Sequence, residues 1–124
     1  MLHGLHHVAL ICGDYARSKA FYTELLELEI IAETYREARD SWKLDLALPG
    51  GGQIELFSFP SPPDRPDRPE AKGLRHLAFS VTDVEEAKQR LETQGVPVRT
   101  DELTGKRFTF FADPDGLPLE LYEG

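Results

Sequence analysis

The sequence predicts an α+β fold made of two tandem βαβββ modules. The first observation is a repeat: residues 4–14 read GLHHVALICGD and residues 73–83 read GLRHLAFSVTD, with a histidine and an aspartate at matching places. The second is a change of pattern, from alternation in these stretches to helical spacing after each aspartate. The length of 124 residues suits a single domain, so the two modules together form one domain.

Both modules have the same order of elements. Asp14 and Asp83 stand where an N-cap residue accepts a hydrogen bond from the first helical turn. Helical spacing follows each of them, and Gly95 suits the end of the second helix. After a further strand each half closes with a hairpin, whose turns we place at residues 49–52 and 113–116.

A proline-rich stretch separates the modules. We place module 1 at about residues 1–59, the linker at about 60–72 and module 2 at about 73–124. Repeated prolines prevent regular structure in the linker and favour an extended crossing. The linker is long enough for exchange of modules between two chains, so we expect a homodimer. Whether the two halves meet within one chain or across a dimer stays open.

The charge balance argues against a polyanionic partner. The net charge is −8, with 22 acidic against 14 basic residues, which disfavours nucleic acid and anionic membrane surfaces. No apolar run approaches the roughly 20 residues of a membrane span, and we expect no secretory leader. Cys12 is the single cysteine, which fits a reducing compartment. We therefore expect a cytoplasmic protein whose partner is a small molecule.

Each half places one histidine and one glutamate on the strand face away from its helix. Side chains alternate along a strand, which assigns His7 and His76 to this face. The same alternation assigns Glu55 and Glu120 to it in the hairpin strands. If the two strands are neighbours, the paired side chains stand about 5 Å apart and can share an ion. A structural role is the simpler interpretation for any one of these residues, but their recurrence in both halves favours a common site.

The segments around these residues carry a family pattern. They are residues 5–10, 21–22, 54–57, 73–79 and 113–120, which read LHHVAL, FY, IELF, GLRHLAF and DPDGLPLE. Over essentially the whole chain they resemble the vicinal oxygen chelate superfamily, the fold of glyoxalase I and bleomycin-resistance proteins. Residues 35–42 and 105–108 resemble a bacterial glyoxalase-like branch of the YaeR type.

The resemblance implies a half-open, barrel-like arrangement of the two modules around one divalent metal ion. Carried over position by position, it makes the ligands His7, Glu55, His76 and Glu120. An all nitrogen and oxygen set leaves places open for substrate or water on a metal that accepts six ligands. Zn or Ni is expected first, while Co, Mn or Fe would also fit.

The resemblance also implies a mechanism in which the metal stabilises an oxyanion or enediolate while a carboxylate moves a proton. Glu120 is the expected base, and Glu55 can share that work. Glyoxalase I has an arginine four residues after its first ligand histidine, where this chain has Ile11. The Asn-Trp segment that follows the first ligand glutamate in glyoxalase I is also missing here. We therefore do not expect the glutathione hemithioacetal as substrate.

Basic and aromatic residues are the candidates for substrate binding. Cations at the rim could hold a carboxylate or phosphate, and aromatic rings could line the wall. The basic candidates are Arg39, Lys43, Lys106 and Arg107, the aromatic candidates are Trp42 and Phe57, and Phe111 and Tyr122 could extend the wall.

The function expected is that of a glyoxalase-like, metal-dependent lyase or isomerase for a small oxygenated substrate that can carry a negative charge. One alternative is a metal-dependent resistance transferase or a dioxygenase on the same scaffold. The other is a non-enzymatic small-molecule-binding protein like the bleomycin-resistance members. Fold by itself does not choose among these, since one architecture hosts many chemistries.

Overall fold

The computed structural model describes the backbone of residues 1–103 and 106–124, and the side chains of residues 1–100 and 108–124. The chain divides into two compact units, Met1–Asp64 and Arg65–Gly124. Most of the proline-rich stretch, from Arg65 onward, thus belongs to the second unit. None of the helices in the described part of the chain is both long and apolar enough to cross a membrane.

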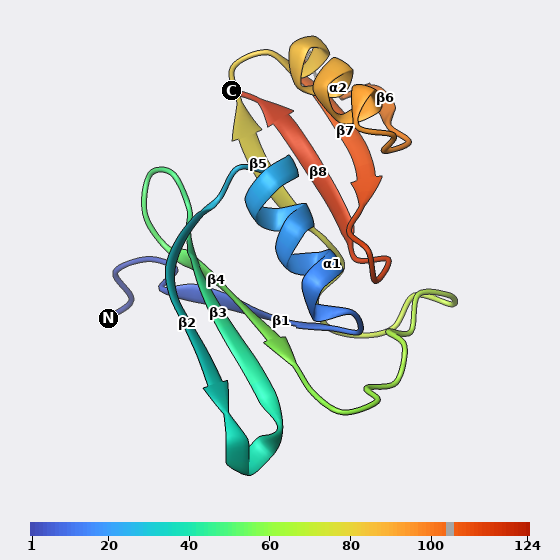
Figure 1. The fold of residues 1–124 in the computed structure, drawn as a ribbon. Coiled ribbons are helices and arrows are strands. Elements are labelled where there is room, and N and C mark those ends of the chain that lie inside the picture. Colours follow the sequence, from blue (N-terminus) through green and yellow to red (C-terminus); the bar gives the residue numbers. More distant parts are fainter. Residues whose placement is uncertain (104–105) are drawn as a thin grey trace. The chain divides into compact units, whose positions relative to one another are not determined.

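The first unit has the expected βαβββ order (Figure 1). Its strands form one four-stranded sheet in the order β1-β4-β3-β2, in which β1 runs parallel to β4 and the other neighbours are antiparallel. The elements are β1 (His7–Cys12), α1 (Tyr15–Ala20), the π-helical turn η1 (Phe21–Leu25), β2 (Glu29–Arg36), the 3-10 turn η2 (Glu37–Arg39), β3 (Ser41–Ala47) and β4 (Gln53–Ser58).

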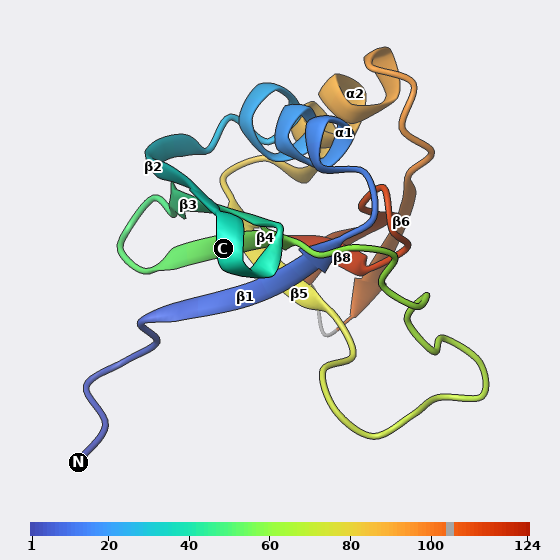
Figure 2. The ribbon, with the colours of Figure 1, turned by 60° about the horizontal axis from the view of Figure 1, so that its bottom comes forward.

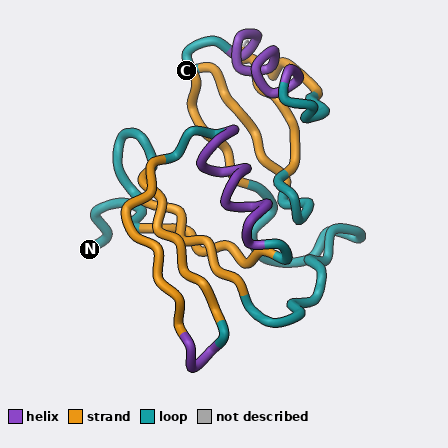
Figure 3. Tube along the Cα trace, in the orientation of Figure 1, coloured by secondary structure: helices purple, strands orange, loops and turns teal. Residues whose placement is uncertain are grey.

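The second unit repeats this order without the two short turns. Its sheet has the order β5-β8-β7-β6, and β5 runs parallel to β8. The elements are β5 (Leu77–Val81), α2 (Val84–Thr93), β6 (Arg99–Leu103), β7 (Lys106–Ala112) and β8 (Pro118–Glu123). The α+β class and the doubled module are confirmed, and the described strands form two four-stranded sheets, one in each unit (Figures 2 and 3).

Local chemistry explains where the helices begin and end. The Asp14 carboxylate accepts a hydrogen bond from the Arg17 amide at 3.1 Å, and the Asp83 carboxylate accepts one from the Glu86 amide at 3.1 Å. Both aspartates are therefore N-caps, as predicted. Gly95 has a φ of 82°, the left-handed conformation that ends a helix at low cost when the residue lacks a Cβ.

Each sheet buries the face that its helix covers. In the first unit, Leu44, Leu46, Ile54 and Leu56 are almost completely buried, and so is Tyr22 from the helical segment. Leu119, Leu121, Val84 and Leu91 play the same part in the second unit. Alternation along the strands leaves the opposite face of each sheet free of this apolar core, and that face carries the His and Glu residues.

The turn before β8 holds the glutamate strand in register. Asp113 is nearly buried, and its Oδ1 accepts hydrogen bonds from the amides of Asp115 and Leu117, both at 2.9 Å. Gly116 completes the turn with a φ of 84°. The turn therefore fixes the start of β8, the strand that carries Glu120.

Replacing Asp113 by Ala should lower the free energy of unfolding by about 2 kcal/mol, because one buried amide and one partly buried amide lose their acceptor. Urea unfolding followed by circular dichroism would measure the loss. Asp64→Ala, an exposed position outside the turn, is the matched control and should change the value by less than about 0.5 kcal/mol. Equal stabilities for the two variants would contradict this account of the turn.

Candidate metal and substrate site

The first unit brings His7 and Glu55 together. His7 opens β1, and the parallel pairing with β4 sets Ala9 level with Glu55. The small alanine leaves room beside the carboxylate, and His7 Nδ1 lies 3.4 Å from Glu55 Oε2. The Glu55 side chain is 13% exposed.

The second unit repeats this arrangement with His76 and Glu120. His76 directly precedes β5, and the pairing with β8 again sets an alanine, Ala78, level with the glutamate. His76 Nε2 lies 3.3 Å from Glu120 Oε2, and the Glu120 side chain is 10% exposed. The two units therefore present matching His–Glu pairs, built on equivalent strands.

His6 Nδ1 lies 2.9 Å from His7 Nδ1, but it does not complete a metal-binding group with the His7–Glu55 pair. No group of three or more His, Cys, Asp or Glu side chains in the described part of the chain is arranged to hold a metal ion. Each unit thus contributes two donors, one imidazole nitrogen and one carboxylate oxygen. Such donors suit a divalent metal of the Zn, Ni, Co, Mn or Fe type.

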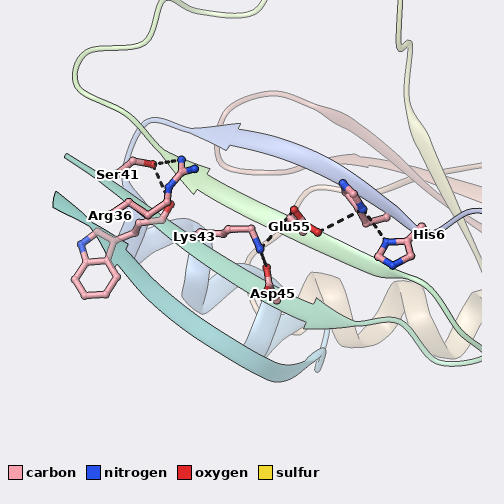
Figure 4. Close-up of polar contacts among 8 residues, drawn as sticks. His6, Arg36, Ser41, Lys43, Asp45 and Glu55 are labelled. Atoms are coloured by element: carbon pink, nitrogen blue, oxygen red, sulfur yellow. Dashed lines mark hydrogen bonds and ion pairs between the residues drawn. The ribbon is translucent and has the colours of Figure 1, made fainter. Parts of the chain in front are cut away.

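A lysine lies beside the second carboxylate oxygen of Glu55 (Figure 4). Lys43 Nζ lies 3.6 Å from Glu55 Oε1 and 2.6 Å from Asp45 Oδ1. The hydrogen bond to Asp45 is the main reason why the pKa of Lys43 is raised. Asp45 stands directly opposite Glu55 across the antiparallel strands, so Lys43 relieves the repulsion between the two carboxylates.

Phe57 extends the same face beyond Glu55. The Arg36 guanidinium carbon lies 4.9 Å from the centre of the Phe57 ring, and the Arg39 carbon lies 5.3 Å from the centre of Phe59. The two rings stack at 6.0 Å. Lys43 therefore lies between Glu55 and Phe57, whereas Arg39 contacts the next ring, Phe59. Sequence reasoning missed Phe59 as a partner, although its spacing of two residues from Phe57 was the available signal.

Trp42 was expected among the substrate contacts, but the structure puts it on the other face of the sheet. It stacks on Tyr15 of the helix, with ring centres 5.5 Å apart and an angle of 9°, and also contacts Tyr35. Adjacent residues of a strand point to opposite faces, so Trp42 and Lys43 cannot both lie beside Glu55. Alternation alone could have shown this.

The remaining candidates lie in the second unit. Lys106 and Arg107 begin β7, and their side chains lie outside the described residues. Phe110, which sequence reasoning did not select, stands directly opposite Glu120. Tyr122 stacks on Phe108 with ring centres 4.8 Å apart. Phe111 was expected as a wall residue, but it is buried on the face that the helix covers, because it is adjacent to Phe110.

A cavity of about 580 Å³ lies in the second unit, over the His76–Glu120 pair. Phe110 and Pro118 contribute to its lining from β7 and β8. Residues within segment 65–76 line it as well, so the second half of the linker and the residues that follow it form part of the candidate site. Sequence reasoning treated this stretch as a connection, because prolines predict irregular backbone without saying where that backbone lies.

With this geometry established, comparison with known proteins identifies the family. The sequence profile of the Glyoxalase/Bleomycin resistance protein/Dioxygenase superfamily matches residues 4–121. The chain belongs to this superfamily. The resemblance read from the sequence is thus confirmed, and members of this superfamily typically use a divalent metal and bind small molecules.

Several similar proteins are known within the superfamily. YwkD of Bacillus subtilis is 61% identical over 99% of this chain and 98% of its own length. YaeR of Escherichia coli is 62% identical over 96% of this chain and 95% of its own. The crystal structure of a glyoxalase family protein from Enterococcus faecalis is 48% identical, covers 98% of both chains and has a TM-score of 0.87.

More distant superfamily relatives, each 32% identical to this chain, have names that denote different reactions. They are a 2-epi-5-epi-valiolone epimerase from Actinomyces, the glutathione transferase FosA from Serratia marcescens and a lactoylglutathione lyase from Salmonella typhimurium. The superfamily thus includes epimerases, transferases and lyases, and membership alone does not select one reaction.

The contact between Tyr15 and Glu33 leads to a prediction about pH. Burial, followed by the 2.6 Å hydrogen bond to Glu33, raises the pKa of Tyr15 well above its usual value of 10. Above pH 10 the unfolded chain loses this proton first, so folding stability must fall as the pH rises. Urea unfolding between pH 9 and about 11 should therefore show a steeper loss for the native chain than for Tyr15→Phe. Parallel curves would contradict the shift.

Proposed function

We propose that this chain is a metal-dependent lyase or isomerase of the glyoxalase type, acting on a small oxygenated substrate. The observation that carries the proposal is the repeated His–Glu pair, with separations of 3.4 Å and 3.3 Å in the two units. Two unrelated structural ion pairs would have no reason to occupy equivalent positions on equivalent strands.

In this proposal one divalent metal ion is held by His7, Glu55, His76 and Glu120. Two donors are too few for a stable site, whereas two pairs supply four, and the two carboxylates balance the ion's charge. The pairs can meet within one chain or between two chains of the homodimer that we propose. When bound, the ion would polarise adjacent substrate oxygens and stabilise negative charge that develops on them.

Glu120 is the better candidate for the base that moves the proton. Among the described residues its polar contact is with His76, and it lines the cavity. Glu55 is more constrained, because His7 faces one of its oxygens and Lys43 the other. Glu120 can therefore reorient toward a substrate proton, while Glu55 is suited to holding its position.

Glutathione is not the proposed co-substrate. Ile11 is level with Phe57 in the paired strands and is 58% exposed, so an apolar side chain stands where the resemblance would place the glutathione-binding arginine of glyoxalase I. Arg39, Lys43 and Phe57 are proposed substrate contacts in the first unit, and Lys106 and Arg107 in the second. Trp42 is not among them, because it packs against Tyr15. The protein's expected place is the cytoplasm, since a chain with a single cysteine cannot form an internal disulfide.

Metal content is the first test of this site. Chain purified without chelator should contain about one divalent ion per chain by mass spectrometry, and His76→Ala should lose it because half of the nitrogen donors are gone. His3→Ala, an exposed histidine near the N-terminus, is the matched control and should keep the ion. Equal metal content in both variants, or failure of the native chain to take up Zn, Ni, Co or Mn, would contradict the site.

Activity is the second test. Metal-loaded protein should convert α-keto aldehydes in the presence of a suitable thiol, or interconvert epimers next to a thioester carbonyl, faster than free metal does. Glu120→Gln should lower the rate at least about 100-fold, because it removes the base. Glu123→Gln, on the same strand but the opposite face, is the control and should keep the rate. A loaded protein no faster than free metal would overturn the enzymatic proposal.

Three alternative functions are known or expected on this scaffold. A 32% identical relative is named a glutathione transferase, so group transfer on this scaffold is a second candidate. A dioxygenase would use two histidines and one glutamate, and intact metal binding in Glu55→Gln would support it. A small-molecule-binding protein without catalysis would bind its ligand equally well after treatment with chelator.

A further inference from the structure

We propose that the proline-rich segment 65–75 is a wall of the substrate cavity, and that Arg68 and Lys72 on it bind an anionic group of the substrate. The inference rests on the proposed function and deepens it, because it gives the substrate a chemical class. That class is a small oxygenated molecule with a carboxylate or a phosphate at the end away from the reacting oxygens.

The cavity has the size of a small-molecule site and combines His76 and Glu120 with basic side chains. Its volume of about 580 Å³ lies within the range of small-molecule sites, which is roughly 300–1,000 Å³. His76 and Glu120, two of the four proposed metal ligands, and the four basic side chains of the segment line the same space. A ligand that reaches the His–Glu pair is therefore enclosed by the linker and not by the sheet alone.

Two of the four basic side chains in segment 65–75 are paired with acidic neighbours. Arg65 is already engaged, since its guanidinium lies 3.2 Å from Asp67 and donates to the carbonyl of Leu74 at 3.4 Å. Arg75 lies 3.8 Å from Glu70. Both acids of the segment that line the cavity are thus matched by neighbouring arginines.

Arg68 and Lys72 have no such match. Neither has an acidic or hydrogen-bonding partner among the described residues, and both line the cavity. Two unmatched cations in one wall contrast with the net charge of −8 on the whole chain. A guanidinium with a nearby ammonium is suited to carboxylate or phosphate, because the planar guanidinium donates two parallel hydrogen bonds.

The lining of the cavity also has an apolar part. Phe110, Pro118 and Leu74 face the same cavity, and Leu74 is 54% exposed. These side chains suit a short carbon skeleton between the two polar ends. A hydroxy acid, an oxo acid or a phosphate ester of similar size satisfies all three parts of the lining.

The segment is also suited to holding its cations in place. Pro66 and Pro69 fix their own φ angles, which lowers the entropy lost when the segment is ordered. Arg65 ties the start of the segment to Leu74 near its end. The wall is therefore braced by groups other than the two cations that would contact the ligand.

The test measures anion binding without turnover. Inorganic phosphate and succinate would each be titrated into the full chain, treated with chelator, by calorimetry. We expect both, or one of them, to bind the native chain at millimolar concentration and the double variant Arg68→Gln, Lys72→Gln at least about tenfold more weakly. Arg17→Gln and Lys88→Gln, cations outside the cavity, are the controls and should bind like the native chain.

The outcomes separate this inference from the proposed function. Preference for phosphate would indicate a phosphate ester, and preference for succinate a carboxylic acid. Binding by the double variant equal to that of the native chain, with unchanged thermal unfolding, would overturn the inference, as would absence of binding of both anions to the native chain. Because no metal or turnover is needed, a failure of the catalytic proposal would leave this result readable.

Discussion

The parallel pairing of the first and last strands of each unit is the constraint on which the site depends. It sets Ala9 level with Glu55 and Ala78 level with Glu120, and in both cases the histidine two residues earlier reaches the glutamate. A shift of one residue would turn each glutamate into the apolar core, where an unpaired carboxylate is costly. Register, and not the identity of the residues alone, therefore creates the two donor pairs.

The units carry the same pair in different surroundings. Glu55 has Asp45 directly across the strand and Lys43 against one oxygen, so its charge is balanced within the sheet. Glu120 has Phe110 across the strand and lines a cavity. Duplication of a module thus supplies two equal His–Glu pairs, and the divergent neighbours underlie the proposal that Glu55 holds the metal while Glu120 moves the proton.

The connection between the modules illustrates a different physical principle. Prolines that cannot join a sheet still restrict the backbone, and an irregular segment can offer polar side chains that a packed strand would bury. Here most of that connection belongs to the second unit and walls the cavity over His76 and Glu120. Under the proposal that this cavity binds the substrate, substitutions in the segment would change substrate preference without disturbing the sheets.

The sequence alone determined the doubled βαβββ order, both N-caps and the strand face of each histidine and glutamate, because these features follow from local spacing and repetition. Tertiary structure decided what spacing cannot specify. Helix packing placed Tyr15 against Trp42, and the pairing of separate strands set Phe110 opposite Glu120 and Lys43 against Glu55. The path of residues 65–75 was also beyond local rules, because a proline-rich segment has no periodicity that would reveal the surface on which it lies.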